Sequence, residues 1–286
     1  MALFGQSNSI SPQWRLILPS RLDGPTNMAI DEALLTSIGE KNQPPTLRFY
    51  EWDSVWVSLG SSQTSADIAE GALGRQGWRL SRRPSGGMAV VHRGQLGYAL
   101  ILPADDQRWH GDLATSYERL SRPFVDGLRH IGVTVHLASP AEKVQFSLDA
   151  PILSARSCFG ALGPYEVVAN GKKIVGNSQV RRRHANLQHG VIQLRGNQST
   201  LADLVASQDE REIAALRDYL DRRVGSLEDL AGHAIGPDDV VHAVAQTMSE
   251  AFAVSFAVDE LTPCERELAE TLVREKYGQD TWTFRR

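Results

Sequence analysis

The chain of 286 residues contains only two cysteines, and no apolar run approaches the roughly 20 residues that a membrane-spanning helix requires. Cys158 and Cys264 lie far apart and show no CxxC or Cys/His metal spacing. The sequence therefore indicates neither a disulfide framework nor a zinc site. The N-terminus also lacks the charged and apolar segments of a signal peptide, so we expect a cytoplasmic protein.

An excess of positive charge is missing as well. The formal net charge is −4 at pH 7, whereas nucleic-acid binding tends to leave an overall basic excess. We therefore expect neither a nucleic acid nor a membrane as a partner, and any partner must be inferred from local features of the sequence.

What the sequence does contain is a series of short strand patterns and three clear helical patterns. Strands are expected at residues 14–19, 47–52, 54–59, 78–83, 88–92, 96–102, 133–137 and 187–194, and helices at 25–38, 66–77 and 115–130. The adjacent strand patterns at 47–52 and 54–59 indicate a hairpin.

A second hairpin is predicted over residues 165–176, because Asn170-Gly171 is the strongest short-range hairpin signal. Beyond Ser199 the pattern is mainly helical to the end. Strands followed by helices predict an α+β fold with a mixed β-sheet core flanked by helices. We expect a single domain over residues 1–286 with a helical C-terminal extension from about residue 199.

A glycine turn after the strand pattern at 78–83 is the first candidate site. Gly86 and Gly87 lack side chains, so backbone N–H groups can approach a ligand closely, and Arg83 supplies charge beside them. A plain turn with solvated arginines explains the same spacing equally well. The segment is not a Walker loop, and the chain has no GxGxxG fingerprint.

Cys158 is the second candidate. A cysteine becomes nucleophilic when positive charge stabilises its thiolate, and Lys172 or Lys173 on the following hairpin could reach it. Taken alone, an isolated cysteine is more often a small buried hydrophobic residue. For Cys264, which follows Thr262-Pro263, this second interpretation is clearly favoured.

The two lysines of the hairpin point to opposite faces of their strand, so only one can reach a buried site. Lys173 precedes the apolar Ile174 and Val175 and is therefore the expected inward residue. A buried lysine needs a partner such as a carbonyl or a carboxylate. The alternative is a solvated lysine at a turn.

Two histidines and a basic run complete the candidates. His92 and His189 could each shuttle a proton at neutral pH, although a hydrogen-bonded core histidine is the more common case. Residues 181–184 form an Arg-Arg-Arg-His run. Such a run is usually a solvated loop, but it could also dock an acidic carrier protein.

Taken together and in order, these motifs resemble the lipoate-protein ligase A and octanoyltransferase superfamily, whose catalytic domain is related to biotin-protein ligase. Within it, Ser157-Cys158-Phe159 with Tyr165-Glu166 resembles the cysteine-bearing octanoyltransferases of the Bacillus type. The sequence departs from the family at Met88, where Gly or Arg is frequent, at Asn177, usually Ser, and at Gly97, often Thr. The matching segments are residues 27–34, 47–52, 57–60, 82–87, 89–90, 92, 171–179 and 187–190.

The resemblance implies roles for nine residues. Cys158 would carry the acyl group as a thioester, and Lys173 would contact the acyl carbonyl and hold the developing oxyanion. The residues expected to bind substrate are Arg83, Ser85, Gly86, Gly87, His92, Gly176 and His189.

The implied reaction moves an octanoyl group from acyl carrier protein to a lysine of a lipoyl-type domain, such as glycine cleavage H protein. It implies no cofactor and no metal. Alternatives are an ATP-dependent lipoate-protein ligase that uses an acyl-adenylate, and an octanoyl amidotransferase between lipoyl-type proteins. A non-catalytic module that kept the fold is a further alternative, and we expect a monomer.

Overall fold

The computed structural model describes residues 11–41, 43–148, 150–163 and 165–286. The first ten residues, which form most of the polar leader, lie outside the described residues. Within the described ranges, no helix is both long and apolar enough to cross a membrane.

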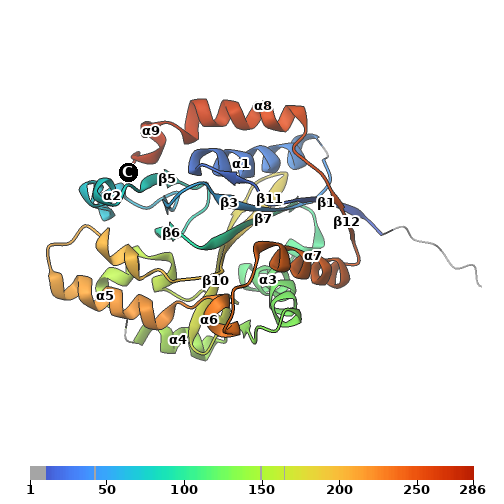
Figure 1. Cartoon of the computed structure of the whole chain (residues 1–286). Helices are drawn as coiled ribbons and strands as arrows, with labels where there is room; N and C mark the ends of the chain where they lie inside the picture. Colours follow the sequence, from blue (N-terminus) through green and yellow to red (C-terminus); the bar gives the residue numbers. More distant parts are fainter. Residues whose placement is uncertain (1–10, 42, 149, 164) are drawn as a thin grey trace, which may run out of the picture.

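A large mixed sheet forms the centre of the molecule (Figure 1). Its strands are β1 (Gln13–Ile17), β2 (Arg21–Leu22), β3 (Thr46–Trp52), β7 (Gln95–Pro103), β8 (His136–Leu137), β9 (Val167–Ala169), β10 (Lys172–Arg181), β11 (Ala185–Gln193) and β12 (Ser255–Val258). The order is β12-β1-β3-β7-β11-β10-β9-β8, with β2 beside β3. Strand β1 runs parallel to β3 and β12, whereas β7, β9, β10 and β11 pair antiparallel.

Helices cover both faces of this sheet. Helix α1 packs with α8 on one face, and α3 packs with α7 on the other (Figure 1). This arrangement confirms the predicted α+β fold. The helices are α1 (Gly24–Lys41), α2 (Glu70–Gln76), α3 (Leu113–His130), α4 (Pro140–Leu148), α5 (Glu210–Arg223), α6 (Leu227–Ala231), α7 (Pro237–Phe252), α8 (Pro263–Leu272) and α9 (Asp280–Thr283).

A smaller sheet has the order β5-β4-β6, from β4 (Trp56–Leu59), β5 (Arg79–Arg82) and β6 (Val90–His92). The hairpin predicted from residues 47–52 and 54–59 is therefore wrong. Strand β3 pairs with β1, β2 and β7, while β4 pairs with β5 and β6. Both edges of β3 are taken by other strands, so the short linker passes the chain from one sheet to the other. Trp56 Nε1 donates to Asp53 Oδ1 at 2.7 Å and stabilises this crossing.

The helix predicted over residues 66–77 is also partly wrong. A 3-10 turn (Ser65–Asp67) precedes α2, and the chain between them is extended at Ile68. The reason is tertiary, because Ile68 forms a β-bridge with Val205 that a continuous helix would not allow.

The region beyond residue 199 is mainly helical, as expected, but it contains one strand that the pattern did not predict. Strand β12 lies at the edge of the large sheet and pairs in parallel with β1. Its side chains are only partly buried, so it lacks a strong apolar alternation.

The hairpin predicted at Asn170-Gly171 is confirmed. Asn170 and Gly171 have φ values of 50° and 72°, the left-handed conformation that tight hairpin turns require. The turn places Lys173 inside the protein, where its side chain is 1% exposed, while Lys172 is only partly covered. The prediction that Lys173 is the inward lysine is confirmed as well.

Candidate active site

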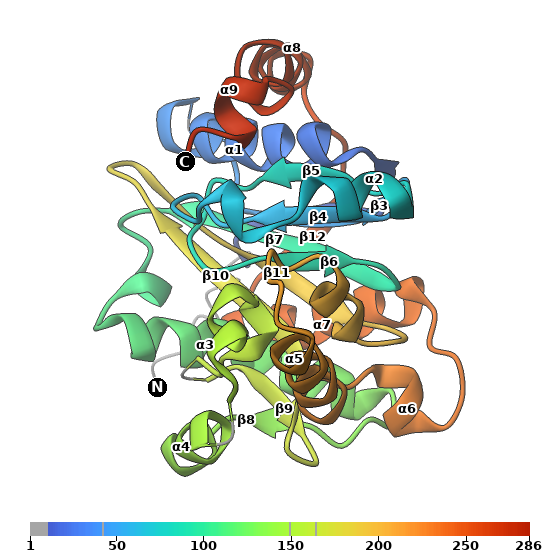
Figure 2. The same ribbon diagram turned by 90° about the vertical axis from the view of Figure 1, so that its left-hand side faces the viewer.

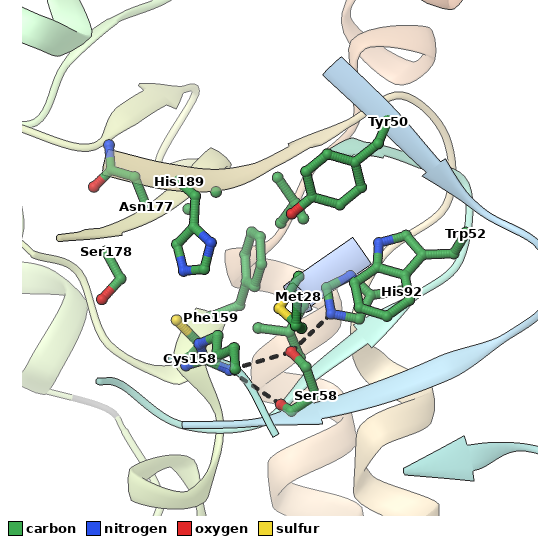
Figure 3. Close-up of a pocket in the computed structure, with 15 residues that line it drawn as sticks. Met28, Tyr50, Trp52, Ser58, His92, Cys158, Phe159, Asn177, Ser178 and His189 are labelled. Atoms are coloured by element: carbon green, nitrogen blue, oxygen red, sulfur yellow. Dashed lines mark hydrogen bonds between the residues drawn. The ribbon is translucent and has the colours of Figure 1, made fainter. Parts of the chain in front are cut away.

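A pocket is lined by residues from both sheets, α1 and the loop that carries Cys158 (Figure 3). Most of its surface is apolar, with a few polar groups, which is typical of a site for a small apolar ligand. The lining residues are Met28, Tyr50, Trp52, Ser58, Arg83, Val90, His92, Cys158, Phe159, Gly176, Asn177, Ser178, His189, Gly190 and Val191.

Most of the residues predicted to form the site come together here. The pocket lining includes Arg83, His92, Cys158, Gly176 and His189. The loop with Ser85, Gly86 and Gly87 flanks the lining, and Lys173 lies behind Cys158. Cys264 is exposed at the start of α8, so the expectation of a buried thiol there is wrong.

Arg83 shapes the glycine loop. Its guanidinium is buried and donates from Nη2 to the carbonyl oxygens of Gly86 and Met88, both at 2.8 Å. Burial lowers the pKa of Arg83 overall, although the nearby Cys158 and Tyr50 oppose this shift. A buried guanidinium beside a cysteine supplies the positive charge that a nucleophilic thiolate requires.

Gly87 brings the loop against the cysteine. Its φ is 90°, and a Cβ at this position would lie 2.8 Å from Arg83 Nη2 and 3.6 Å from Cys158 Sγ. Any larger residue would be strained and would press on the guanidinium. The glycine thus allows Cys158 Sγ to lie directly beside the backbone of the loop.

Arg82, next to Arg83 on the chain, points the other way. It donates to the carbonyl oxygens of Gly60, Trp282 and Thr283 and so attaches the C-terminal segment to the back of the glycine loop. The two arginines that the sequence shows side by side therefore have different surroundings, and only Arg83 reaches the pocket.

Cys158 begins a 3-10 turn (Cys158–Gly160), and its backbone N–H donates to Ala89 O at 2.9 Å. Lys173 Nζ donates to Cys158 O at 2.9 Å and to Ala161 O at 3.2 Å, and it pairs with Glu166 Oε1 at 2.7 Å. The three ammonium protons thus have three protein acceptors. Lys173 fixes the backbone of the cysteine loop from behind.

Glu166 was not singled out as a partner of Lys173 from sequence. Besides the ion pair, its Oε2 accepts from the backbone N–H of Gly163 at 2.7 Å, so this carboxylate closes the loop that follows Cys158. The usable signal was its position one residue before β9, the strand that pairs with the strand carrying Lys173.

His92 is fully hydrogen-bonded. Ser58 Oγ lies 2.7 Å from Nε2, and Gln95 Oε1 lies 3.1 Å from Nδ1, so Nδ1 carries the proton of the neutral ring. The ring stacks on Trp52 with centroids 3.8 Å apart. Burial lowers the pKa of His92 well below its usual range, and the charge of Arg83 lowers it further. His92 is therefore neutral at pH 7.

His189 has a different set of partners. Its Nδ1 lies 2.9 Å from Asp31 Oδ2, and its Nε2 lies 2.5 Å from Ser85 Oγ. Asp31 also pairs with Arg48 at 2.7 Å, and all four side chains are buried. A carboxylate only accepts, so Nδ1 carries a proton and Nε2 is left to accept from Ser85.

Sequence reasoning did not single out Asp31 or Arg48 as part of the site. Asp31 lies on α1, four residues after Asn27, whose Oδ1 accepts from Arg48 Nη2 at 2.6 Å. Two polar residues at this spacing on the inner, otherwise apolar face of a helix were the available signal.

One departure from the family pattern has a structural reason. A Cβ at Gly97 would lie 2.4 Å from the ring of Tyr50, which lines the pocket. The glycine therefore makes room for the tyrosine. Among the residues that the structure describes, no group of three or more His, Cys, Asp or Glu side chains could hold a metal ion.

The fold and the site define a catalytic domain of the lipoate ligase class. Residues 23–249 match the model of the lipoyl protein ligase A/B catalytic domain, and the chain belongs to this family. It is an acyltransferase of the octanoyltransferase type. It is 36% identical to octanoyltransferase LipM of Kyrpidia tusciae, over 96% of this chain and 99% of that protein. It is 30% identical to LipM of Bacillus subtilis, over 96% and 98% of the two chains.

Solved structures agree on the fold. A bipartite lipoate protein ligase from Thermoplasma acidophilum, studied with its E2 lipoyl domain, superposes with a TM-score of 0.79 at 24% identity and covers 96% of each chain. A lipoate-protein ligase A bound with ATP superposes with a TM-score of 0.74 at 23% identity, over 96% of this chain and 98% of that one. The predicted family membership is confirmed.

Proposed function

We propose that the protein transfers an octanoyl group from an acyl carrier protein thioester to a lysine of a lipoyl-type domain, through an octanoyl thioester on Cys158. The observation that carries this proposal is the position of Cys158. Its side chain lines an apolar pocket, beside Gly87 and near a buried guanidinium. The named LipM relatives support octanoyl as the acyl group.

The transfer has two halves. The Cys158 thiolate attacks the carbonyl carbon of the donor thioester and forms an acyl-enzyme as the carrier thiol leaves. The amine of the acceptor lysine then attacks the new thioester, and the amide forms as Cys158 leaves. The donor thioester supplies the free energy, so this route uses no ATP.

Lys173 is the proposed oxyanion donor, together with backbone N–H groups of the glycine loop. Its Nζ is 2.9 Å from the backbone carbonyl oxygen of Cys158, so Lys173 is held next to the residue that would carry the acyl group. All three of its protons have protein acceptors, and one of these bonds must be exchanged for the oxyanion. The ion pair with Glu166 at 2.7 Å holds the Lys173 side chain in this position.

We further propose that the carrier protein docks at the turn between β10 and β11. Residues 181–184 are exposed at this turn, and Figure 2 shows the hairpin projecting from the body of the molecule. The same strand carries Asn177 and Ser178 at the pocket, and three residues of strand span on the order of 10 Å. Complementary charge would steer an acidic carrier to this turn.

The deciding experiment is intact mass spectrometry after incubation with octanoyl carrier protein and without ATP. We expect an octanoyl mass increase that hydroxylamine removes, and no increase with Cys158→Ala. Full transfer by Cys158→Ala would overturn the proposal. A requirement for ATP and free octanoate would instead identify a ligase, and loading only from an octanoylated lipoyl protein would identify an amidotransferase. A Cys264→Ala variant serves as the matched cysteine control and should load normally.

A further inference from the structure

Residues 280–286, which we call the α9 segment, contain helix α9 and lie beyond the match to the catalytic-domain model, which ends at residue 249. Figure 1 shows α9 beside β5, the strand that leads into the glycine loop of Ser85, Gly86 and Gly87. A segment outside the matched domain thus reaches the back of the active site.

Arg82 is the first link between this segment and the site. Its side chain is fully buried, and Nε and Nη2 donate to Thr283 O at 3.0 Å and 2.7 Å. Nη1 donates to Gly60 O at 2.7 Å and to Gln63 O at 2.6 Å. These acceptors are backbone carbonyl oxygens, so one rigid guanidinium fork fixes the main chain at three places at once.

Residues 60–65, which we call the support loop, form the second link. On one side of this loop, the N–H and the hydroxyl of Ser65 both donate to Arg286 O at 2.7 Å. On the other side, the N–H of Ser61 donates to Ser85 O at 2.8 Å. Hydrogen bonds therefore connect the α9 segment to the support loop, and the support loop to the glycine loop.

The support loop and the glycine loop also touch without a side chain between them. A Cβ at Gly60 would overlap the carbonyl oxygen of Gly87, so the two backbones are in direct contact. Gly87 in turn lies against the cysteine, since a Cβ on Gly87 would be 3.6 Å from Cys158 Sγ. Because the protein interior is closely packed, a displacement of the support loop would be transmitted to the backbone beside this sulfur.

We propose that the α9 segment is a positioning element of the acyltransferase. Through Arg82 and the support loop, it holds the glycine loop at the distance from Cys158 that acyl transfer requires. Arg82 does not line the pocket, so it is a positioning residue and not a catalytic one. The inference rests on the proposed function, which assigns backbone N–H groups of the glycine loop to the oxyanion. Misplacing such a group by about 1 Å can cost about 10²-fold in rate.

The alternative role for these contacts is stability alone, and two variants separate the roles. Arg82→Lys keeps a buried positive charge, but one ammonium group cannot reproduce the five-donor fork, so it cannot hold the support loop and the α9 segment as before. Glu265→Gln, on α8, is the matched control. It breaks the buried pair with Arg15, which joins α8 to β1 and contacts neither loop.

The test measures single-turnover acylation of Cys158 by octanoyl-pantetheine, at a temperature where each variant is folded. We expect Arg82→Lys to lower the maximal rate by about 10- to 100-fold and to change the half-saturating donor concentration by less than about twofold. Glu265→Gln should lower stability and keep the wild-type rate. Phe284→Ala removes an exposed side chain of the α9 segment and should also keep this rate.

Hydrogen exchange, followed by mass spectrometry, gives a second readout. Amides of the glycine loop should exchange faster in Arg82→Lys than in wild type, and at the wild-type rate in Glu265→Gln. An Arg82→Lys enzyme that is acylated as fast as wild type overturns the proposal. So does a Glu265→Gln enzyme that loses as much rate as Arg82→Lys, because the loss would then follow stability.

If Arg82→Lys does not fold, Trp282→Phe decides. It keeps an aromatic ring and removes the Nε1–H that donates to Arg82 O at 2.9 Å, so we expect a fall in rate of about 3- to 10-fold. A wild-type rate in this variant would reject the role of the segment. The proposed function fails separately, if wild-type enzyme forms no acyl-enzyme on Cys158.

Discussion

Two buried arginine–carboxylate pairs of almost the same chemistry lie in different parts of this molecule. Arg48 pairs with Asp31 at 2.7 Å, and Arg15 pairs with Glu265 at 2.7 Å. In the first pair the other carboxylate oxygen accepts from His189 at the pocket. In the second pair the carboxylate belongs to a residue in the first turn of a helix, and it also accepts a backbone hydrogen bond at the start of that helix.

That helix is α8. Glu265 Oε2 accepts from the backbone N–H of Thr262, and Thr262 Oγ1 accepts from the backbone N–H of Glu265, so the pair forms a capping box. Arg15 lies on β1, and the ion pair therefore attaches α8 to the sheet. The comparison teaches that burial and pairing alone do not identify a functional group, because buried ion pairs also serve structure.

The substitution Asp31→Asn tests most directly whether the Arg48–Asp31 pair differs in function from the Arg15–Glu265 pair. The amide keeps the shape but can donate to His189 Nδ1, which favours the other tautomer and takes the acceptor at Nε2 away from Ser85 of the glycine loop. We therefore expect the rate of acyl transfer to fall by about 10² to 10⁴. Single-turnover transfer to a lipoyl domain measures this rate. Thermal unfolding is the control, because it shows whether the loss of the charged partner of Arg48 destabilises the fold. A rate within about threefold of wild type would place this pair with the purely structural one.

The matching change in the other pair is Glu265→Gln. It leaves Arg15 buried without its charged partner, so we expect the free energy of unfolding to drop by about 3 to 5 kcal/mol. Urea denaturation at pH 7 measures the drop. Turnover of the folded variant should equal that of wild type, and a specific loss of turnover would contradict the structural role.

The same pair predicts a pH effect. Burial alone would raise the pKa of Glu265, but its hydrogen bonds to Arg15 and Thr262 lower it overall. A carboxylate with a lowered pKa stabilises the fold above its unfolded pKa of about 4.3, and this stability is lost as pH falls through the folded pKa. The difference in stability between wild type and Glu265→Gln should therefore shrink below about pH 4, as urea titrations at several pH values will show.

Lys173→Ala tests a third buried pair, which touches the cysteine loop. If Lys173 is the main oxyanion donor, its loss should raise the barrier by about 2.7 to 4 kcal/mol. Single-turnover acylation of Cys158 by octanoyl carrier protein gives this value, with circular dichroism to confirm the fold. An unchanged rate would assign Lys173 to structure alone, beside Arg15.

The smallest expected effect is at the surface. Arg183→Glu at the β10–β11 turn should raise the KM for octanoyl carrier protein by about fivefold, or about 1 kcal/mol, and should not change turnover of octanoyl-pantetheine. Arg75→Glu, an exposed arginine on α2, is the control and should change neither value. Equal effects at both positions would show that the turn is not a docking surface.

Local sequence signals predicted local structure well. Asn170-Gly171 specified its turn because two left-handed residues in sequence have few other solutions, and the inward position of Lys173 followed from strand alternation. The strand patterns at 47–52 and 54–59 were correct as strands but wrong as partners. Strand pairing depends on distant segments, which adjacent sequence does not report.

The site was predictable to the same degree. The glycine loop and Cys158 have compact motifs, but the groups that position His189 lie far apart in the chain. Asp31 precedes His189 by 158 residues, and it follows the same pattern as any polar residue on a helix. Its role emerges only when α1 covers the sheet. The sequence motifs identify the candidate residues, whereas only the fold shows which charged side chains lie beside them.

The pairing of β1 with β12 bears on how the protein is made. Gln13 lies opposite Ser255 in this parallel pair, so β1 emerges from the ribosome about 240 residues before its edge partner, on the order of 10 to 50 s earlier at usual synthesis rates. During that time the strand presents unpaired backbone groups that can associate with another nascent chain. Slow or paused synthesis should therefore lower the yield of this protein more than its final stability would indicate.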